Sequence, residues 1–405
     1  MKILIFNQYF WPENFRINEI ACALKSRGHE VEVMTGKPNY PEGKFFSGYS
    51  AWGAKKESWR NIPIYRVPML ARGNGGAIKL ALSYLSYIVS GFLFAPWLLR
   101  KEKYDVIFVY GISPIFQAIP ASFLGWIKGV PVVLWVQDLW PQSAEATGYV
   151  KSPFLLKLLE RFVRFTYAHT DLLLVQSEAF IEPVSELAPN IPIAYYPNSV
   201  SKEFYSPQAI SAPYIESLQS GFTVLFAGNV GTAQAVATIV AATEKLKTYT
   251  DIKIVILGGG IKSGWVAEKI FEKKLTNLYL EGRFPVETMP TLMRQASVFL
   301  VTLTNQPIFE LTVPNKIQAY LAVGKPIIAC LNGEGARIVS EAQAGVAVRA
   351  EDSNGLAEAI VKLYQMSEFE REHMGVNGRA YFKLHFDEEM LITKLIKHFE
   401  KLILR

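Results

Sequence analysis

The chain has 405 residues, of which half are hydrophobic and 19% are charged. This length predicts two domains, and the composition excludes a disordered chain. Cys22 and Cys330 lie far apart in apolar surroundings, and the five histidines show no metal-ligand spacing. We therefore expect reduced thiols in a cytoplasmic protein, and no metal site.

The first residues, MKILIFNQYF, predict a short strand and lack the apolar region and cleavage site of a signal peptide. We expect the protein to stay inside the cell. The net charge of +6 is concentrated in residues 1–200, with 20 basic and 15 acidic residues. Residues 37–103 hold 11 basic, 3 acidic and 12 aromatic residues. This bias suits an anionic membrane surface or nucleic acid, or is only a solvated basic face.

Strand-like runs alternate with helical patterns in the first half of the chain. The expected strands are 3–9, 31–36, 62–67, 105–110, 132–138, 171–177 and 193–198. Helical patterns occupy the segments between most of them, most clearly at 18–28 and 155–169. This alternation predicts a parallel sheet covered by helices on both faces.

One apolar run, 77–99, is long enough to span a bilayer. It contains Lys79, three serines and Pro96, and it lies between two expected strands of a soluble-looking pattern. Basic residues follow it at 100, 101 and 103, as is typical of an interfacial segment. We predict a helix that is partly core and partly membrane-contacting, and a pure core helix stays open as the alternative.

Residues 201–220 break the alternation with two prolines and scattered serines, which predicts a linker. Further strands are expected at 223–229, 252–260, 278–283, 298–303, 326–331 and 345–350, and the end of the chain is helical from about residue 353. The fold class is therefore α/β, with two doubly wound Rossmann-like domains, 1–200 and 201–385, facing a central cleft. A helix at 386–405 is expected to cross back to the first domain. Ligands of such sheets bind at the carboxyl ends of the strands.

Glycine-rich turns follow the first two expected strands of the second domain. The candidate anion-binding residues in these turns are Gly228, Asn229, Gly231, Thr232, Gly258 and Gly259. Glycines at a strand-to-helix turn bring backbone N–H groups close to an anion, although a tight turn alone also requires glycine. Neither turn matches a Walker loop or a GxGxxG motif.

Two further stretches supply side chains for a phosphate or a base. Arg283 and Phe284 follow the third strand and suit a phosphate and a stacked base, or they belong to an ordinary loop. In FELTVPNKIQAYLAVGKP, 309–326, Pro314 fixes the chain and Asn315 is expected to cap a helix that begins at Lys316. That helix start and the lysine ammonium suit a diphosphate.

Acidic residues near the strand ends are candidates for catalysis. Glu310, upstream of this helix, either accepts a sugar hydroxyl or is a structural loop acid. In the first domain, polar residues follow the first strand, at an edge that usually faces the crevice. Glu13 is a catalytic candidate there, and Asn14, Arg16, Asn18 and Glu19 are candidates for the acceptor side. Asp138 is the first acid after another strand, and capping of the next element is the alternative role.

The chain resembles a known family in several of these blocks. RGHEVEVMTG, the GN-x-G turn, LGGG and NK-x-x-x-YLAVGKPIIA are similar to family 4 glycosyltransferases of the GT-B fold, over essentially the whole chain. The VQDLWP block and the PNKIQAYLAVGKP form resemble, more narrowly, bacterial transferases of O-antigen, capsule and colanic acid synthesis. Within these, the resemblance is to the N-acetyl-L-fucosamine transferase type.

This resemblance implies a metal-independent, retaining transferase without a cofactor, whose UDP-sugar donor binds the second domain and whose acceptor binds the first. Of the family's pair of glutamates, Glu310 matches the one that contacts the donor sugar. The ribose-binding partner falls on Gln318 by spacing or on Ala319 by alignment of the following block. The family's Arg/Lys pair is absent, so phosphate binding falls to backbone N–H groups, Lys316 and Arg283. Gln137 and Asp138 occupy the region of the family's histidine.

We expect Asp138 and Glu13 to orient or deprotonate the acceptor hydroxyl. The resemblance and the basic segment imply a lipid-diphosphate-linked saccharide acceptor and peripheral contact with the anionic inner face of the cytoplasmic membrane. We expect a monomer or weak dimer that does not bind nucleic acid. Two alternatives stay open: a UDP-sugar epimerase of the same fold, and a non-catalytic subunit that binds a UDP-sugar.

Overall fold

The structure is a computed structural model that describes residues 1–405 except 74–75, 147, 149, 151, 207–210 and 405. The chain divides into two compact units, unit 1 (1–197 with 389–405) and unit 2 (198–388). The sequence placed these boundaries after residues 200 and 385. The expected linker at 201–220 is not free where it is described, because Ile215 and Leu218 are buried in the core of unit 2.

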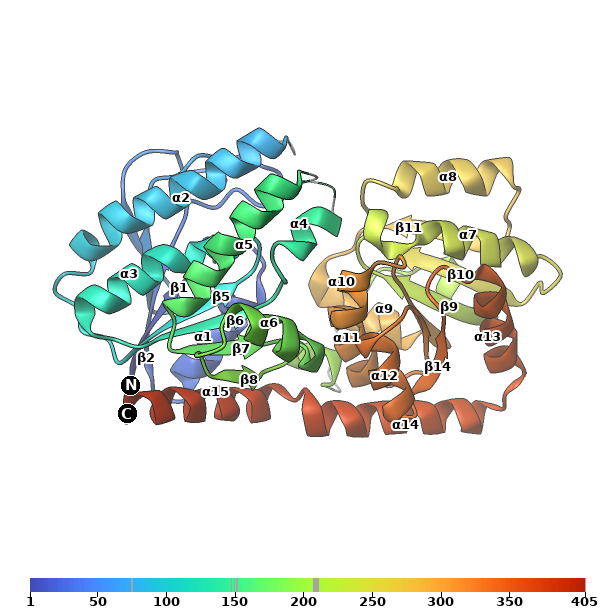
Figure 1. Ribbon diagram of the computed structural model, residues 1–405. Coiled ribbons are helices and arrows are strands. Elements are labelled where there is room, and N and C mark those ends of the chain that lie inside the picture. The colour runs from blue at the N-terminus through green and yellow to red at the C-terminus, as the bar shows by residue number, and fades with distance from the viewer. Residues whose placement is uncertain (74–75, 147, 149, 151, 207–210, 405) are drawn as a thin grey trace. The chain divides into compact units, whose positions relative to one another are not determined.

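Unit 1 contains an eight-stranded sheet in the order β3-β4-β2-β1-β5-β6-β7-β8 (Figure 1). Its strands are β1 Lys2–Phe6, β2 Glu30–Thr35, β3 Lys55–Trp59, β4 Ile62–Arg66, β5 Val106–Gly111, β6 Val132–Val136, β7 Leu172–Val175 and β8 Ile193–Tyr195. The pairs are parallel except β3 with β4. Residues 3–6 of β1 are fully buried, which explains why a continuous apolar run forms a strand with both faces covered.

Strand β3 was not predicted from the sequence. Its residues, KKESW, are mostly charged, as suits an edge strand exposed to water. It joins β4 through Arg60 and Asn61, which both have positive φ angles. Two such residues between paired strands are typical of a tight hairpin turn.

Helices cover both faces of the unit 1 sheet. They are α1 Arg16–Ser26, α2 Ala77–Leu98, α3 Ala118–Lys128, α4 Gln142–Ala146, α5 Pro153–Ala168, α6 Ile181–Leu187 and α15 Glu388–Ile403. Buried residues of α1 and α15 share one core cluster, with Leu395 and Phe399 among them. On the other face α2 and α3 pack over the sheet, with Phe6 against Tyr87 and Gly91 against Pro120.

Unit 2 contains a six-stranded parallel sheet in the order β11-β10-β9-β12-β13-β14 (Figure 1). The strands are β9 Phe222–Ala227, β10 Ile252–Leu257, β11 Leu278–Gly282, β12 Val298–Thr302, β13 Ile327–Cys330 and β14 Gly345–Val348. The helices are α7 Val236–Lys245, α8 Ser263–Glu272, α9 Met289–Arg294, α10 Pro307–Leu311, α11 Asn315–Val323, α12 Glu334–Glu341, α13 Ser353–Gln365 and α14 Glu368–His385. The strand order reverses between β9 and β12, the point where α/β sheets bind ligands.

Both sheets are thus doubly wound, and the predicted α/β class with two Rossmann-like domains is confirmed.

Candidate functional site

The glycine turns of unit 2 pack against one another at the carboxyl edge of the sheet. A methyl group placed on Gly258 would lie 1.7 Å from the carbonyl oxygen of Gly228, and one on Gly259 would lie 2.9 Å from Nε of Arg283. A methyl group on Gly228, whose φ is +127°, would lie 2.8 Å from Cε of Lys316. These positions need glycine because of close approach, and they bring the ends of β9, β10 and β11 together with the start of α11.

Lys316 is the cation at the centre of this arrangement. Its ammonium nitrogen lies 3.4 Å from the centre of the Phe226 ring. The nitrogen is buried and has no hydrogen-bond partner among the described residues. Burial lowers the pKa of Lys316 to about 7. A buried amine without a partner is costly, so this site is suited to an incoming anion.

The rest of α11 fixes the position of Lys316. One turn further along the helix, the Tyr320 hydroxyl accepts a hydrogen bond from the N–H of Ala227 (3.0 Å) and donates to the carbonyl of Leu300 (3.2 Å). At the other end, the Arg379 guanidinium donates to the carbonyls of Val323 and Gly324. The second half of the helix is therefore held to the sheet through Tyr320 and to α14 through Arg379.

The glycine turns offer fewer free N–H groups than the sequence suggested. The N–H of Gly228 donates to the carbonyl of Leu257, and that of Gly258 donates to Gly282. The N–H of Gly231 donates to the side-chain oxygen of Gln234, which also accepts from the Asn229 amide. Thr232 begins the short 3-10 turn that carries Gln234 and is exposed. Lys316 thus takes a larger share of any anion binding here.

Arg283 and Phe284 follow β11 at the same edge. The Arg283 side chain is exposed and runs along the backbone of Gly259. Phe284 is partly buried against the core of unit 2. This places the guanidinium beside the glycine turns and leaves only part of the ring available to a base.

Glu310 lies on α10 and is exposed. Its backbone packs on Gly333, where a methyl group would lie 1.9 Å from the Glu310 carbonyl oxygen. Its carboxylate accepts a hydrogen bond from the Asn332 amide at 3.4 Å, and the Asn332 oxygen accepts from the N–H of Ala350. Asn332 was not among the predicted site residues, although a polar residue just after β13 indicates this edge of the sheet.

Two expectations at α11 need correction. The helix begins at Asn315, and its N-cap is Pro314 with no side-chain hydrogen bond, so Asn315 does not cap it. Gln318 is 0% exposed, and neither of its amide atoms has a partner among the residues described. A bond from Gln318 to a ribose hydroxyl would therefore require the helix to move. Ala319 is partly exposed but carries only a methyl group.

In unit 1, Glu13 and Asn18 hold the loops beside β1 and β2. The Glu13 carboxylate accepts hydrogen bonds from the N–H groups of Asn39 (2.8 Å) and Tyr40 (2.7 Å). It is 2% exposed, and burial raises its pKa to about 7. The side-chain oxygen of Asn18 accepts a hydrogen bond from the N–H of Trp11, and its amide nitrogen donates one to the carbonyl of Glu13. These contacts assign both residues to loop structure rather than to substrate.

Asp138 occupies a different setting after β6. Its carboxylate accepts hydrogen bonds from the N–H (3.2 Å) and the hydroxyl (2.8 Å) of Ser113, and that hydroxyl also accepts from the indole N–H of Trp140 (3.0 Å). Burial raises the pKa of Asp138, yet the residue is partly exposed. Of the two acids predicted as catalytic in unit 1, Asp138 is the more exposed.

The other predicted acceptor residues lie at the start of α1. Arg16 and Glu19 form an ion pair, and Asn14 is exposed. Burial raises the pKa of Tyr110, and the charges of Asp138, Arg16 and Glu19 all act on that hydroxyl.

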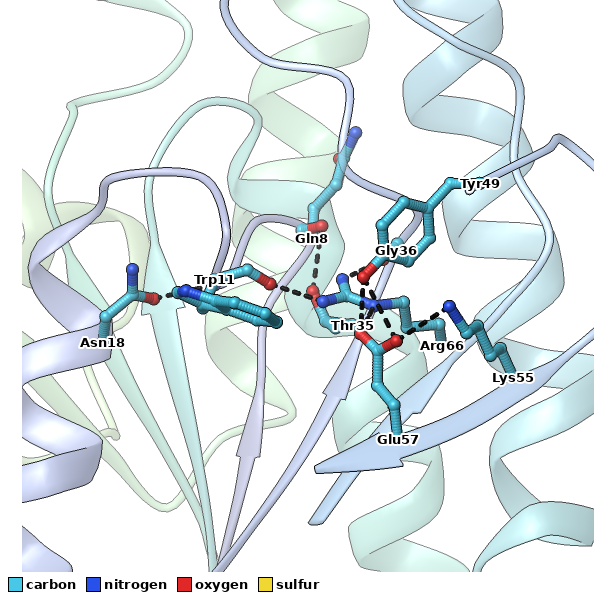
Figure 2. Close-up of polar contacts among 9 residues, drawn as sticks. All are labelled: Gln8, Trp11, Asn18, Thr35, Gly36, Tyr49, Lys55, Glu57 and Arg66. Carbon is cyan, nitrogen blue, oxygen red and sulfur yellow. Dashed lines mark hydrogen bonds and ion pairs between the residues drawn. The ribbon is translucent and has the colours of Figure 1, made fainter. Parts of the chain in front are cut away.

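A buried arginine accounts for part of the basic character of residues 37–103. Arg66 is 0% exposed and donates to the carbonyls of Trp11 and Gly36 and to the Glu57 carboxylate (Figure 2). Glu57 also pairs with Lys55 at 3.1 Å. Although burial opposes it, the bond to Arg66 lowers the pKa of Glu57. Arg66 is therefore used inside the domain and is not available to a membrane.

A cavity of about 1060 Å³ lies elsewhere in unit 1. Its lining includes the segments at the amino ends of β6 and β7, parts of α3 and α5, and Leu402 and Ile403 of α15. Because it is at the amino edge of the sheet, it is not the predicted site. Within the described part of the chain, no group of three or more His, Cys, Asp or Glu side chains is placed to hold a metal ion.

Comparison with family models gives one match in each half of the chain. Residues 14–199 match the model described as "Glycosyl transferase 4-like domain". Residues 221–366 match the model described as "Glycosyl transferases group 1". The two matches lie almost entirely within unit 1 and within unit 2, respectively.

Two bacterial proteins are similar in sequence. The putative colanic acid biosynthesis glycosyl transferase WcaI of Escherichia coli (strain K12) is 25% identical over 343 residues, covering 80% of this chain and 82% of the relative. The probable glycosyltransferase WbjE of Pseudomonas aeruginosa is 26% identical over 319 residues, covering 76% and 78%.

Solved structures share the fold at low identity. Sucrose-phosphate synthase from Thermosynechococcus elongatus matches with a TM-score of 0.73 and 16% identity, covering 99% of this chain and 98% of that one. HepE of Anabaena, in complex with UDP, matches with a TM-score of 0.67 and 16% identity, covering 99% and 100%.

Proposed function

Because this chain belongs to the family 4 glycosyltransferases of the GT-B fold, we propose that it transfers a sugar from a UDP-sugar to a lipid-linked saccharide in surface polysaccharide synthesis. The name of the relative WcaI, a putative colanic acid transferase, supports this pathway class. The similarity to HepE, whose structure contains UDP, supports a uridine nucleotide. We place the donor on unit 2 and the acceptor on unit 1.

The observation that carries the donor site is the Lys316 ammonium, buried without a partner among described residues and packed against Gly228. A diphosphate bound here would supply the missing acceptor. The N-terminus of α11 adds its positive dipole end. Arg283, exposed beside Gly259, is a second cation for the same phosphates.

In the proposed reaction, the bond between the anomeric carbon and the UDP β-phosphate oxygen breaks, and the acceptor oxygen bonds to that carbon. Negative charge builds up on the departing UDP, where Lys316, Arg283 and the helix dipole stabilise it without a metal. Glu310 orients the donor sugar through its hydroxyls. Asp138 orients the acceptor hydroxyl, whose proton passes to Asp138 or to the leaving phosphate, and we propose that configuration is retained.

We further propose which sugar is transferred, which acceptor receives it and where the protein works. The transferred sugar is N-acetyl-L-fucosamine or a related N-acetylamino sugar, and the acceptor is a diphosphate-linked lipid saccharide. The protein works as a monomer or weak dimer, peripheral to the cytoplasmic membrane on its inner face. Support for the membrane location comes from α2, a helix long and apolar enough to span a bilayer, of whose most apolar stretch only 22% is buried.

The test is mass spectrometry after incubation of the full chain with UDP-sugars and lipid-linked N-acetylglucosamine. We expect one UDP-sugar to give an acceptor heavier by one sugar residue, together with UDP. An epimerised donor without any acceptor would instead support an epimerase. Tight UDP binding with no product from any pair would support a non-catalytic subunit.

A further inference from the structure

Helix α2 of unit 1 presents its large apolar residues outward. The residues of its inner row, Ser83, Tyr87, Gly91 and Ala95, are mostly small and are buried. The outer row, at the same helical spacing, is Ile78, Leu82, Leu85, Val89, Leu93 and Trp97, with exposures between 47% and 78%. A helix that faces water normally has the opposite arrangement.

Helix α5 carries a second exposed apolar row. It consists of Phe154, Leu155, Leu158, Phe162 and Phe165, each 39–75% exposed. At helical spacing these residues fall within an arc of about 100°. Lys157, Arg161 and Arg164 fall on a neighbouring arc and are exposed, while the buried residues Val163, Thr166 and Tyr167 face the core.

Contacts place these two rows on one side of the domain, with the end of α3 between them. Phe162 of α5 contacts the ring of Phe116, at the start of the segment that leads into α3. Phe165 and Trp126 both line the cavity described above. Trp126, at the end of α3, is 79% exposed and stacks on Phe123, which contacts Phe92 of α2. Figure 1 shows α2, α3 and α5 covering the same face of the sheet.

We propose that α5, together with α2 and the end of α3, forms a docking surface for an anionic phospholipid bilayer. We call it the α2–α5 face and define it by the two exposed rows and Trp126. Its exposed aliphatic side chains and its aromatic rings suit burial in the interfacial layer of a bilayer. This deepens the proposed function, because a lipid-linked acceptor lies in that layer, but it adds a helix that the apolar run 77–99 alone does not include.

The basic residues around the α2–α5 face indicate which partner binds it. Basic residues border the face at Arg100, Lys101 and Lys103 after α2 and at Lys157 and Arg161 on α5, and all are exposed. A row of cations beside an apolar strip is the pattern that binds anionic headgroups while the apolar residues enter the acyl region. A second copy of this chain would instead bring the same cations together, which disfavours it as the occupant.

Co-sedimentation of the full chain with vesicles tests the proposal. The test variant is Leu158→Gln with Phe162→Gln, and the matched control is Phe271→Gln, at an 86% exposed residue of α8 in unit 2. With vesicles of phosphatidylglycerol and phosphatidylcholine, we expect the double variant to lose at least about tenfold in partition coefficient and the control to match wild type. Phosphatidylcholine alone should bind the wild type less.

A second readout reports insertion directly. The chain has eight tryptophans of its own, and Trp97 and Trp126 lie in the α2–α5 face, so each variant is compared with wild type. The fluorescence added by Phe162→Trp should be quenched by brominated acyl chains, whereas the fluorescence added by Phe271→Trp should not. Unchanged partition of the double variant, or absence of quenching at 162, would overturn the proposal. The proposal would also be overturned if the wild type did not bind vesicles but formed a dimer in sedimentation velocity, and if the double variant lost that dimer.

The same preparations separate this proposal from the proposed function. Each is assayed for UDP binding by calorimetry and for melting by circular dichroism. A chain that binds vesicles through α5 but transfers no sugar leaves the docking surface standing and removes the transferase proposal. A chain that transfers sugar but binds no vesicles would leave the transferase proposal standing and would remove the docking surface.

Discussion

The ammonium nitrogen of Lys316 lies 3.4 Å from the centre of the Phe226 ring. Phe226 lies in β9, and the Lys316 side chain packs against Gly228, which follows that strand. The ring face favours the charged amine, while burial lowers the pKa of Lys316 to about 7. With no partner on the nitrogen among the residues described, the site is poised for an anion. The proposed donor site depends on this pair of residues.

Binding of UDP should depend on pH through Lys316. A neighbouring diphosphate favours the ammonium, so the pKa of Lys316 is higher in the complex than in the free protein. The contribution of Lys316 to UDP affinity should therefore be constant below about pH 7 and should fall above it, by up to about tenfold for each pH unit. Calorimetry across this range measures the effect, with proton uptake on binding as a second sign.

The control for this pH effect is Lys316→Arg, whose guanidinium stays charged throughout. The UDP phosphate also titrates, and it does so equally with both proteins. The difference between their affinities at each pH therefore reports the titration of Lys316 alone. A wild type whose affinity changes with pH in parallel with Lys316→Arg would contradict the assigned role.

Glu310→Ala should lower turnover by about a hundredfold or more while leaving UDP affinity unchanged. The reason is that Glu310 is exposed on α10 and is proposed to orient the sugar, not the nucleotide. Steady-state transfer assays and UDP titrations measure the two effects. The matched control is Glu358→Ala, an exposed acid on α13. Transfer at the wild-type rate would remove Glu310 from the mechanism.

The two acids of unit 1 should behave differently. Asp138→Asn should lower turnover about a hundredfold without lowering the melting temperature, because the amide can still accept the Ser113 bonds. Glu13→Ala should mainly destabilise the fold, by about 2 kcal/mol, because the N–H groups of Asn39 and Tyr40 lose their acceptor. Transfer assays on the folded fraction and thermal melts separate the two. An active Asp138→Asn enzyme would contradict the assignment.

Gln318→Met should leave UDP affinity within about twofold and raise stability by about 1 kcal/mol. The physical reason is that its amide is fully buried without a partner among described residues, and removal of an unsatisfied polar group is favourable. Thermal melts and UDP titrations are the measurements. A large loss of affinity would return Gln318 to the ribose site.

The hydrophobic periodicity and the turn residues of the sequence were sufficient to predict most of the strands and helices. Buried parallel strands such as β1 and β9 are continuous apolar runs, so their positions could be predicted from the sequence. Strand β3 was missed because KKESW has no apolar run, and its identity depends on pairing with β4. Edge strands of this kind are set by tertiary context rather than by local pattern.

The positions of several candidate site residues at strand ends could be predicted from the sequence, but their contacts could not. Glycines after β9 and β10 and the lysine of α11 could be found because ligand sites follow strand ends. Burial of Gln318 could not, since one residue along a helix separates an exposed position from a core position. Nor could the sequence show that Glu13 faces backbone N–H groups from a loop 26 residues away.

The most direct test of the donor site is titration of UDP into the wild type, Lys316→Met and Lys325→Met at about pH 6, where the amine is charged. Lys325 lies at the opposite end of α11 and serves as the matched control. The account predicts that Lys316→Met weakens binding about tenfold to a hundredfold, as expected for loss of a charged contact, with Lys325→Met unchanged. Equal affinities for all three proteins would contradict it.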